Sequence, residues 1–208
     1  MQQQEIKTTG TTTVGLVCRD CVILAAESKS TMGWLVSSKT AQKLHPVDDR
    51  IAVTISGAVG DAAALIRILR AEIRLYKLMR NADFSVRSAA NLLSNILQGT
   101  RYYPYMAMLI VAGVDKTGSH VYSVDPIGGT EEDRYTATGS GSPMAYGVLE
   151  DGFRDGMAKD EGVKLAVRAI RAAAERDVFS GGKDINVAII DKDGIQYADR
   201  EKIKELAK

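Results

Sequence analysis

Apolar residues change their spacing in blocks along this chain, and the order of the blocks constrains the fold more than any other feature of the sequence. Runs rich in β-branched and apolar residues predict strands at Thr11–Val17, Cys21–Ala26, Trp34–Ser37, Ile51–Ile55, Met106–Gly113, Ser119–Val124, Tyr135–Thr138, Ile185–Ile190 and Ile195–Tyr197. Apolar residues three and four positions apart predict helices over 62–76, after Ser85 as N-cap, over Met144–Asp151 and from Asp160. The order is strands, two helices, strands, two helices, strands.

Segregation of strands and helices into blocks favours an α+β fold with mainly antiparallel sheets over an alternating parallel fold. Turn signals at Asp115–Gly118 and Asp191–Gly194 are typical of hairpins, which join antiparallel strands. Two stacked sheets between two helix layers would bury all the apolar faces at once. No linker rich in Pro, Ser or Gly divides the 208 residues, so we expect a single domain, 11–208, behind a short polar leader, 1–10.

Composition excludes several classes of function. The net charge is only +1, which argues against a dominant electrostatic attraction to nucleic acid or to an anionic membrane. No apolar run reaches the length of about 18 residues that a membrane-spanning helix needs. The first ten residues lack the apolar middle region of a signal peptide, so we expect a cytoplasmic protein.

The polar segment with the clearest chemical potential is Gly10-Thr11-Thr12-Thr13-Val14-Gly15, at the start of the first predicted strand. A threonine hydroxyl needs a base to become a nucleophile, and a free α-amino group on the same residue can serve. Such an amine has a pKa near ~7.7–8.0 and is partly neutral at physiological pH. This chemistry requires cleavage after Gly10, whose carbonyl no Cβ shields. Taken alone, the segment is better explained as the start of an ordinary strand.

Further signatures accompany this segment in order along the chain. They are Glu27 after the second predicted strand, Lys43 within Thr40–Leu44, Gly57 within Thr54–Asp61, Gly139–Pro143 with Tyr146–Glu150, and Asp-x-x-Ser-Gly-Gly within Arg176–Gly182. Each residue alone has an ordinary explanation as a surface charge, turn residue or helix cap. Together the segments resemble the β-type subunits of the proteasome, archaeal ones in particular, over nearly the whole chain.

The resemblance implies a four-layer αββα sandwich, the fold of N-terminal-nucleophile hydrolases, and a threonine endopeptidase that uses no metal or cofactor. It implies that Thr11 Oγ is the nucleophile, and that the precursor cleaves itself between Gly10 and Thr11 to remove Met1–Gly10. Lys43, paired with Glu27, would keep an ammonium group near the nucleophile and stabilise developing negative charge. The resemblance further implies that Ser140, Asp177 and Ser180 form a hydrogen-bonding set around the α-amine. It also implies that the Gly57 N–H binds the oxyanion.

Substrate-binding residues also follow from the resemblance. The pocket for the side chain before the cleaved bond would be lined by Ser30, Ala41, His45, Ile55, Val59 and Ala63. Ala41, Val59 and Ala63 are small, and Ile55 would form an apolar floor. These features predict cleavage after large apolar residues, the chymotrypsin-like preference. His45 is a departure that would admit polarity or narrow the pocket. Ser30, Thr31 and Gly57 would pair with the substrate backbone as with an added strand.

The resemblance also implies partners. Seven-membered β rings, homo-oligomeric or mixed, would stack with outer rings of α-type subunits into a 28-subunit barrel with an enclosed chamber. A regulatory ATPase would deliver unfolded polypeptides through the α rings. Two related alternatives remain at this point, namely a β subunit kept for ring assembly without catalysis and the simpler bacterial ring peptidase with an N-terminal threonine.

A third alternative comes from another class of protein. Cys18-Arg19-Asp20-Cys21 is a Cys-x-x-Cys segment, which occurs in redox and zinc modules. Zinc usually needs four ligands, and neither His45 nor His120 completes a second pair. The segment also spans a predicted hairpin turn instead of a helix N-terminus. Two small strand cysteines are the simpler interpretation, and a local disulfide remains open.

Overall fold

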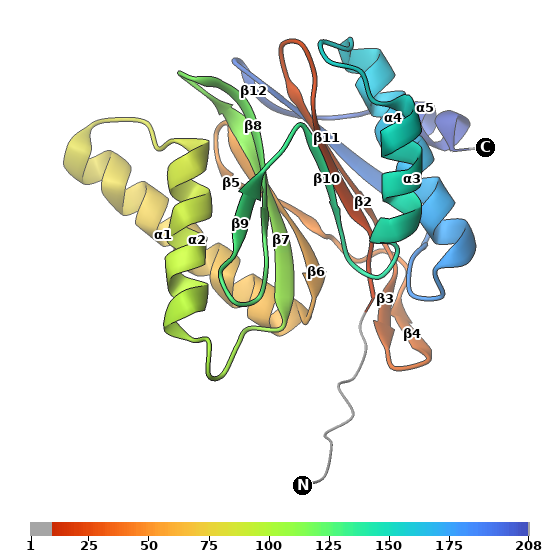
Figure 1. The fold of residues 1–208 in the computed structure, drawn as a ribbon, viewed down its shortest axis with the longest axis horizontal. Coiled ribbons are helices and arrows are strands. Elements are labelled where there is room, and N and C mark those ends of the chain that lie inside the picture. Colours follow the sequence, from red (N-terminus) through yellow and green to blue (C-terminus); the bar gives the residue numbers. More distant parts are fainter. Residues whose placement is uncertain (1–9, 208) are drawn as a thin grey trace, which may run out of the picture.

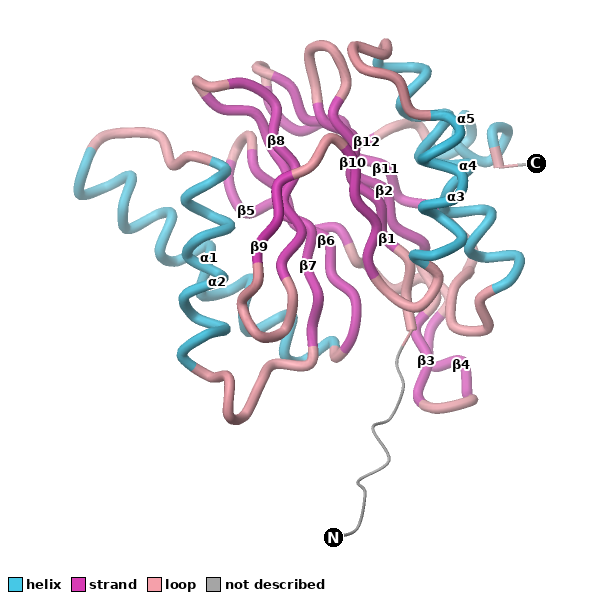
Figure 2. The backbone as a smooth tube through the Cα atoms, viewed as in Figure 1, coloured by secondary structure: helices cyan, strands magenta, loops and turns pink. Residues whose placement is uncertain are grey.

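Two antiparallel sheets stack face to face, and helices cover the outer face of each (Figure 1). The computed structural model describes residues 10–207, so the predicted leader Met1–Gly10 lies outside the described residues except for Gly10. Figure 2 shows the helices confined to the two outer layers and the strands to the two inner ones. This arrangement confirms the predicted αββα sandwich.

The first sheet has the strand order β10–β1–β2–β11–β12, with every neighbouring pair antiparallel. Its strands are β1 Thr13–Val17, β2 Val22–Glu27, β10 Tyr135–Thr138, β11 Ile185–Asp191 and β12 Gly194–Tyr197. The helices on its side of the molecule are α3 Ser142–Gly152, α4 Lys159–Arg176 and α5 Arg200–Leu206. The predicted hairpin turns at Arg19-Asp20 and Asp191–Gly194 are confirmed, because Val17 pairs with Val22 and Asp191 with Gly194.

The second sheet has the strand order β5–β6–β7–β8–β9 and is also antiparallel throughout. Its strands are β5 Leu44–Asp48, β6 Ile51–Gly57, β7 Ala107–Asp115, β8 Gly118–Val124 and β9 Thr130–Glu132. Helices α1 Val59–Arg80 and α2 Val86–Gly99 cover its outer face. A separate hairpin, β3 Ser30–Met32 with β4 Leu35–Ser38, projects beside the first sheet.

Helix ends follow their local chemistry. Ser85 caps α2 as predicted, because its Oγ accepts a hydrogen bond from the Ser88 N–H at 3.0 Å. At the start of α4, the Glu161 carboxylate accepts the Ala158 N–H at 2.9 Å. Helix α1 ends at Asn81, which adopts the left-handed conformation with φ 47°.

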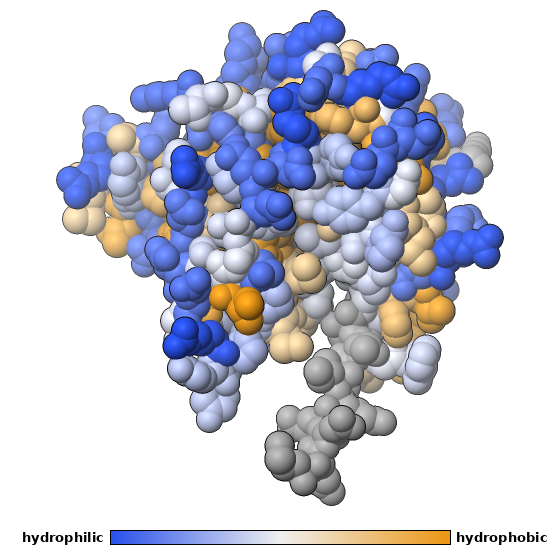
Figure 3. Space-filling model, viewed as in Figure 1, coloured by the Kyte–Doolittle hydropathy of each residue, from blue (hydrophilic) through white to orange (hydrophobic). Residues whose placement is uncertain are grey.

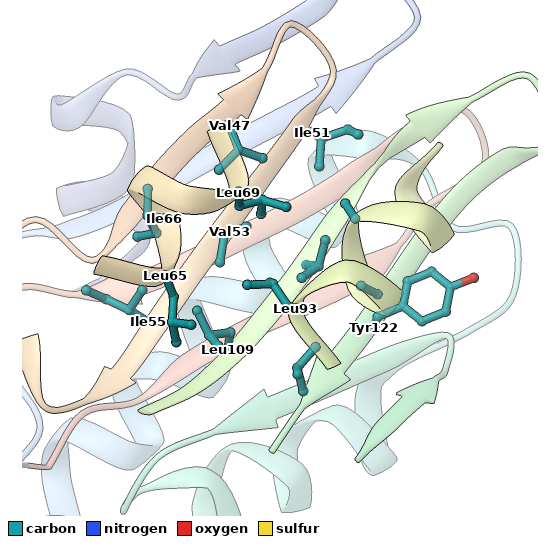
Figure 4. Close-up of a cluster of buried hydrophobic side chains, with 14 of the residues drawn as sticks. Val47, Ile51, Val53, Ile55, Leu65, Ile66, Leu69, Leu93, Leu109 and Tyr122 are labelled. Atoms are coloured by element: carbon teal, nitrogen blue, oxygen red, sulfur yellow. The ribbon is translucent and has the colours of Figure 1, made fainter. Parts of the chain in front are cut away.

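Three hydrophobic cores correspond to the three spaces between layers. The first lies between the second sheet and helices α1 and α2, where side chains such as Leu65, Leu69 and Leu109 interdigitate (Figure 4). The second lies between the first sheet and the helices α3 and α4. The third lies between the two sheets and contains Leu24 and Ile110. The layers are therefore held by burial of apolar area, at roughly 25 cal/mol per Å².

The surface in the view of Figure 3 is mainly hydrophilic, with small hydrophobic areas between the charged ones. Several large apolar side chains are nevertheless exposed at the end of α1, including Leu78 at 84% and Met79 at 74%. Among residues 10–207, no helix is long and apolar enough to cross a membrane.

Candidate active site

Thr11 is buried immediately before β1, with 5% of its surface exposed. The turn after β10 passes directly over it, because a Cβ on Gly139 would lie 1.9 Å from the Thr11 carbonyl oxygen. Gly139 also has φ +96°, a conformation that favours glycine. The Gly-Ser-Gly-Ser segment therefore packs closely against Thr11, the candidate nucleophile. This close contact explains why the first residue of the segment is glycine.

Lys43 connects Thr11 to Glu27. Its ammonium nitrogen donates to Thr11 Oγ1 at 2.7 Å and also to Glu27 Oε1. The two charged side chains are 6% and 1% exposed. Lys43 lies just before β5 and Glu27 ends β2, so the pair joins the two sheets. The structure thus brings together the three residues that the resemblance assigned to nucleophilic chemistry.

Backbone N–H groups hold the Glu27 carboxylate in place. Oε1 accepts from the Thr12 N–H at 3.3 Å, while Oε2 accepts from the Lys29 N–H at 2.5 Å and from the Gly181 N–H at 3.2 Å. Gly181 belongs to the Ser-Gly-Gly segment and has φ +130°. These donors leave the carboxylate little freedom to move, so it fixes the position of the Lys43 ammonium group.

Burial works against both charges of this pair. Burial raises the pKa of Glu27, and the positive charge and hydrogen bond of Lys43 counteract the increase. Burial likewise lowers the pKa of Lys43, and the Glu27 charge counteracts that decrease. Each charge therefore stabilises the other against the effect of burial.

A second hydrogen-bonded group surrounds the Thr11 backbone nitrogen. The Thr11 N–H donates to Ser140 Oγ at 3.3 Å, and Ser140 Oγ donates to Asp177 Oδ2 at 2.6 Å. Ser180 Oγ donates to the same carboxylate oxygen at 2.6 Å. Asp177 is the C-cap residue of α4, so the end of this helix positions the group. Of the three residues predicted to surround the α-amine, Ser140 contacts this nitrogen, and Asp177 and Ser180 are connected to it through Ser140 and the shared carboxylate oxygen.

The segment before Thr11 fits only glycine. A Cβ on Gly10 would lie 1.9 Å from the Cβ of Phe179 and 2.4 Å from Ser140 Oγ, far inside contact distance. Thr11 Oγ1 donates to the Gly10 carbonyl oxygen at 2.7 Å. The Thr11 hydroxyl therefore lies next to the Gly10 carbonyl, the group that it would attack to release the leader.

Gly57 is the last residue of β6, near the Gly139 turn that contacts Thr11. It has φ +102°, and a Cβ there would lie 2.3 Å from the Met106 carbonyl oxygen. Its neighbour Ser56 lies below the Gly139 turn, since a Cβ on Gly139 would be 3.4 Å from Ser56 Cβ. The backbone at Gly57 is thus close to the turn that covers Thr11, and glycine is required there for steric reasons alone.

The predicted substrate-binding residues come from several elements around the second sheet and its first helix. Ser30 and Thr31 lie on β3, which pairs with β4 alone and leaves its other edge without a strand among the described residues. The others are Ala41 in the loop before Lys43, His45 on β5, Ile55 on β6, and Val59 and Ala63 on α1. Two of their side-chain atoms are buried without a hydrogen-bond partner, Thr31 Oγ1 and His45 Nε2.

The Cys-x-x-Cys segment does not form a metal cluster in the described part of the chain. Cys18 and Cys21 are buried free cysteines at the β1–β2 turn, where the Cys18 N–H donates to the Cys21 carbonyl at 2.8 Å. Residues 10–207 contain no group of three or more potential His, Cys, Asp or Glu ligands. The turn lines a cavity of about 1270 Å³, whose lining includes neither Thr11 nor Lys43.

The sequence did not reveal several supporting residues. Thr12 Oγ1 is hydrogen-bonded to Ser180 Oγ at 2.7 Å, and Lys29 Nζ donates to the Val178 carbonyl at 2.6 Å. No sequence motif identifies Lys29 or Thr12 as a supporting residue. Their hydrogen bonds are to groups that only the folded chain brings close to them. The position of Thr12 beside Thr11 was the one available hint.

Comparisons with known proteins identify the family that this chain resembles. A family model described as "Proteasome subunit" matches residues 7–190. "Proteasome subunit beta" of Methanoregula boonei is 51% identical over 205 residues, which cover 98% of this chain and 96% of the relative. "Proteasome subunit beta" of Methanosarcina mazei is 50% identical over 196 residues, 94% of this chain and 93% of the relative. The protein of the same name from Methanocaldococcus jannaschii is 48% identical over 199 residues, covering 95% and 88%.

Proposed function

The chain belongs to the proteasome β-type subunits, and from this premise we propose that it is a catalytic threonine endopeptidase that exposes its own nucleophile, Thr11. The proposal rests mainly on one observation, the contact of Lys43 Nζ with both Thr11 Oγ1 and the buried carboxylate of Glu27. A subunit retained only for assembly has no need to bury an ion pair against a threonine hydroxyl, because burying two charges has a desolvation cost.

The position of the Thr11 hydroxyl, whose Oγ1 is 2.7 Å from the Gly10 carbonyl oxygen, supports self-cleavage. Attack of Oγ on the carbonyl carbon transfers the Gly10 acyl group from the Thr11 nitrogen to Oγ, and the nitrogen takes up a proton. Water then hydrolyses the resulting ester and releases residues 1–10 with a free carboxylate. The product carries a free α-amino group on Thr11, which was an amide nitrogen in the precursor.

In the mature subunit, the α-amino group takes the proton of Thr11 Oγ as the hydroxyl attacks a substrate carbonyl. Ser140 and Asp177 are positioned to orient this amine, because the Thr11 nitrogen already donates to Ser140 Oγ in the precursor. The Lys43 ammonium stabilises negative charge on Oγ, and the Gly57 N–H stabilises the oxyanion. Neither step requires a metal or cofactor.

As a proteasome β subunit, the chain assembles into a proteasome core with other subunits. We propose that residues 1–10 form the leader and 11–208 one catalytic domain, in β rings stacked with α-type rings in a 28-subunit barrel. The exposed apolar side chains at the end of α1, Leu78 and Met79, support an assembly surface there. The barrel would act in the cytoplasm on unfolded polypeptides that a regulatory ATPase feeds through the α rings.

The residues predicted to line the specificity pocket support a preference for large apolar residues before the cleaved bond. Val59 and Ala63 at the start of α1 are small, and Ile55 on β6 supplies an apolar side chain. His45 adds a polar group with an unpartnered Nε2. Burial and the nearby charge of Arg70 lower the pKa of His45, so the ring is neutral at pH 7 and compatible with an apolar side chain.

Co-expression with an α-type subunit tests the proposed function. We expect the mass of the assembled β chain to correspond to a start at Thr11, and we expect the particles to hydrolyse peptides with Phe, Tyr or Leu before the cleaved bond. Peptides with Arg or Glu at that position serve as controls and should be poor substrates. Assembled particles that keep residues 1–10 and lack activity would instead support the non-catalytic alternative. Active particles that prefer Arg or Glu would contradict only the specificity.

Substituting Gln for Glu27 should shift the pH dependence of activity. The Glu27 charge raises the pKa of Lys43 against the effect of burial, so removing that charge should lower the pKa of Lys43 further. Because the proposed mechanism uses the Lys43 ammonium, the alkaline limb of the kcat profile should move to lower pH. Asp48→Asn, which changes the partner of Lys77 away from the site, is the matched control and should leave the limb in place. An unchanged limb in Glu27→Gln would contradict the role given to the pair.

A further inference from the structure

The space between the two sheets changes character along its length. At one end it is filled by apolar side chains such as Val17, Ala52 and Ile110. At the end nearest Thr11, the inward-facing residues are instead hydroxyl-bearing. They are Thr13 on β1, Thr138 on β10, and Thr54 and Ser56 on β6, and all four are at most 4% exposed.

These four side chains form one connected network across the sheets. Thr54 Oγ1 donates to Thr13 Oγ1 at 2.8 Å, and Thr13 Oγ1 shares a hydrogen bond of 2.8 Å with Thr138 Oγ1. Ser56 Oγ donates at 3.3 Å to Thr138 Oγ1 and lies 3.3 Å from the Met108 carbonyl. Two of the contacts, Thr54 to Thr13 and Ser56 to Thr138, join one sheet to the other.

Every strand in the network leads directly into a group of the candidate active site. Thr13 is two residues after Thr11, and Thr138 is two residues before Ser140. Ser56 immediately precedes Gly57, and Thr54 lies on the same face of β6 two residues earlier. The network therefore connects the segment of the nucleophile, the segment of the amine-binding serine and the segment of the oxyanion glycine.

Apolar packing would be the simpler way to fill this space. A buried hydroxyl without a partner costs about 1–3 kcal/mol, whereas valine has nearly the shape of threonine and needs no partner. Apolar contacts tolerate small sliding movements, while hydrogen bonds are directional and fix the distance between donor and acceptor. A hydroxyl network at this position therefore restricts how the two sheets can shift against each other.

The Gly139 turn also lies close to both Thr11 and Ser56 at this end. A Cβ on Gly139 would lie 1.9 Å from the Thr11 carbonyl oxygen and 3.4 Å from Ser56 Cβ. Short hydroxyl side chains leave room for this approach and hold it at a defined separation. This close approach is an observation separate from the hydrogen bonds, and it involves the same three segments, those of Thr11, Ser140 and Gly57.

We propose that Thr13, Thr54, Ser56 and Thr138 are positioning residues for peptide hydrolysis, which hold the Thr11 hydroxyl at a fixed distance from the Gly57 N–H. This inference rests on the proposed function. The network acts through the strands that carry the reacting groups, and none of its members touches the scissile bond. Its loss is expected to slow the chemical step without weakening substrate binding.

The test compares Thr13→Val with Thr13→Ser and Thr136→Val in assembled, processed particles. Thr13→Val keeps the shape and removes the hydroxyl, and we expect kcat to fall about 10- to 100-fold with KM nearly unchanged. Thr13→Ser restores the hydroxyl and should recover most of kcat. Thr136 is equally buried on β10 but is hydrogen-bonded to Tyr146 at 3.0 Å outside the network, so Thr136→Val should retain wild-type kcat.

Thr54→Val supplies a second arm from the other sheet and carries the test if Thr13→Val fails to assemble. Its kcat should also fall, and the Thr13→Val/Thr54→Val double variant should lose little more than the worse single variant, because both remove the same hydrogen bond. Full kcat per assembled particle in Thr13→Val or Thr54→Val, even with a lowered melting temperature, would overturn the inference and leave a structural role only. An inactive wild-type particle would overturn the proposed function and this inference with it.

Discussion

Thr11→Ala is expected to keep residues 1–10 attached in assembled particles and to reduce peptide hydrolysis to background, a loss of about 10⁴-fold or more in kcat. The hydroxyl that lies 2.7 Å from both the Gly10 carbonyl and the Lys43 ammonium is then missing, and no neighbouring group can take its place. Thr12 lies next in sequence, but its hydroxyl is hydrogen-bonded to Ser180. The measurement is the intact mass of the β chain together with hydrolysis of a peptide ending in a large apolar residue.

Thr11→Ser is the matched control for this experiment. It retains the hydroxyl and loses only a methyl group, so the leader should still be removed and activity should remain measurable. Removal of residues 1–10 from Thr11→Ala particles in the absence of active wild-type subunits would show that another nucleophile or another protease processes the chain. That result would contradict self-cleavage, while residual peptide hydrolysis by Thr11→Ala would contradict the identity of the nucleophile.

Lys43→Ala should abolish both processing and peptide hydrolysis, with a loss of about 10³-fold or more. It should also destabilise the subunit by roughly 3–5 kcal/mol, because it leaves the carboxylate of Glu27 buried without its cation. Burial already raises the pKa of Glu27, and without Lys43 that pKa should rise further. Single-turnover hydrolysis and thermal melting of the assembled particle measure the two effects.

Two further variants separate catalysis from stability. Lys43→Ala/Glu27→Gln removes the unpaired charge, and we expect it to recover much of the melting temperature while remaining inactive. Lys77→Ala removes a lysine whose ion pair with Asp48 is partly exposed, so it should cost no more than about 1 kcal/mol and leave kcat unchanged. Wild-type kcat in Lys43→Ala would show that the ammonium is dispensable and would contradict the proposed mechanism.

The periodic elements of the fold could be predicted, and the short aperiodic ones could not. Helix α2 was recognisable because its cap and its buried face are both local features of the sequence. Strand β5 was missed because it contains a proline and a register shift beside Pro46, so its side chains do not alternate. Strands β3 and β9 have three residues each and are too short to show a period. Their pairing with neighbours defines them, and pairing is not visible in one segment.

The candidate site shows the same division. Thr11, Lys43 and Glu27 could be named from the order of motifs, through the resemblance. The backbone donors that hold Glu27 and the hydroxyl network around Thr13 could not be predicted from the sequence. A threonine in a strand looks the same in the sequence whether its side chain only packs or also forms hydrogen bonds. The structure alone shows that Gly10 is enclosed by Phe179 and Ser140, so that no other residue fits immediately before Thr11.

The amino-acid sequence by itself determined the family, the order of most strands and of helices α1 to α4, and the residue types of the candidate site. It could do so because hydrophobic periodicity and linear motifs are local properties. The tertiary structure decided which charges share a site, which hydroxyls connect the sheets and how closely the Gly139 turn approaches Thr11. These features depend on contacts between residues that are distant in the sequence, from 16 positions for Glu27 with Lys43 to 129 for Thr11 with Ser140. The pairing of β10 with β1 brings Thr138 to Thr13, and the packing of the two sheets brings Lys43 to Glu27 and Thr54 to Thr13.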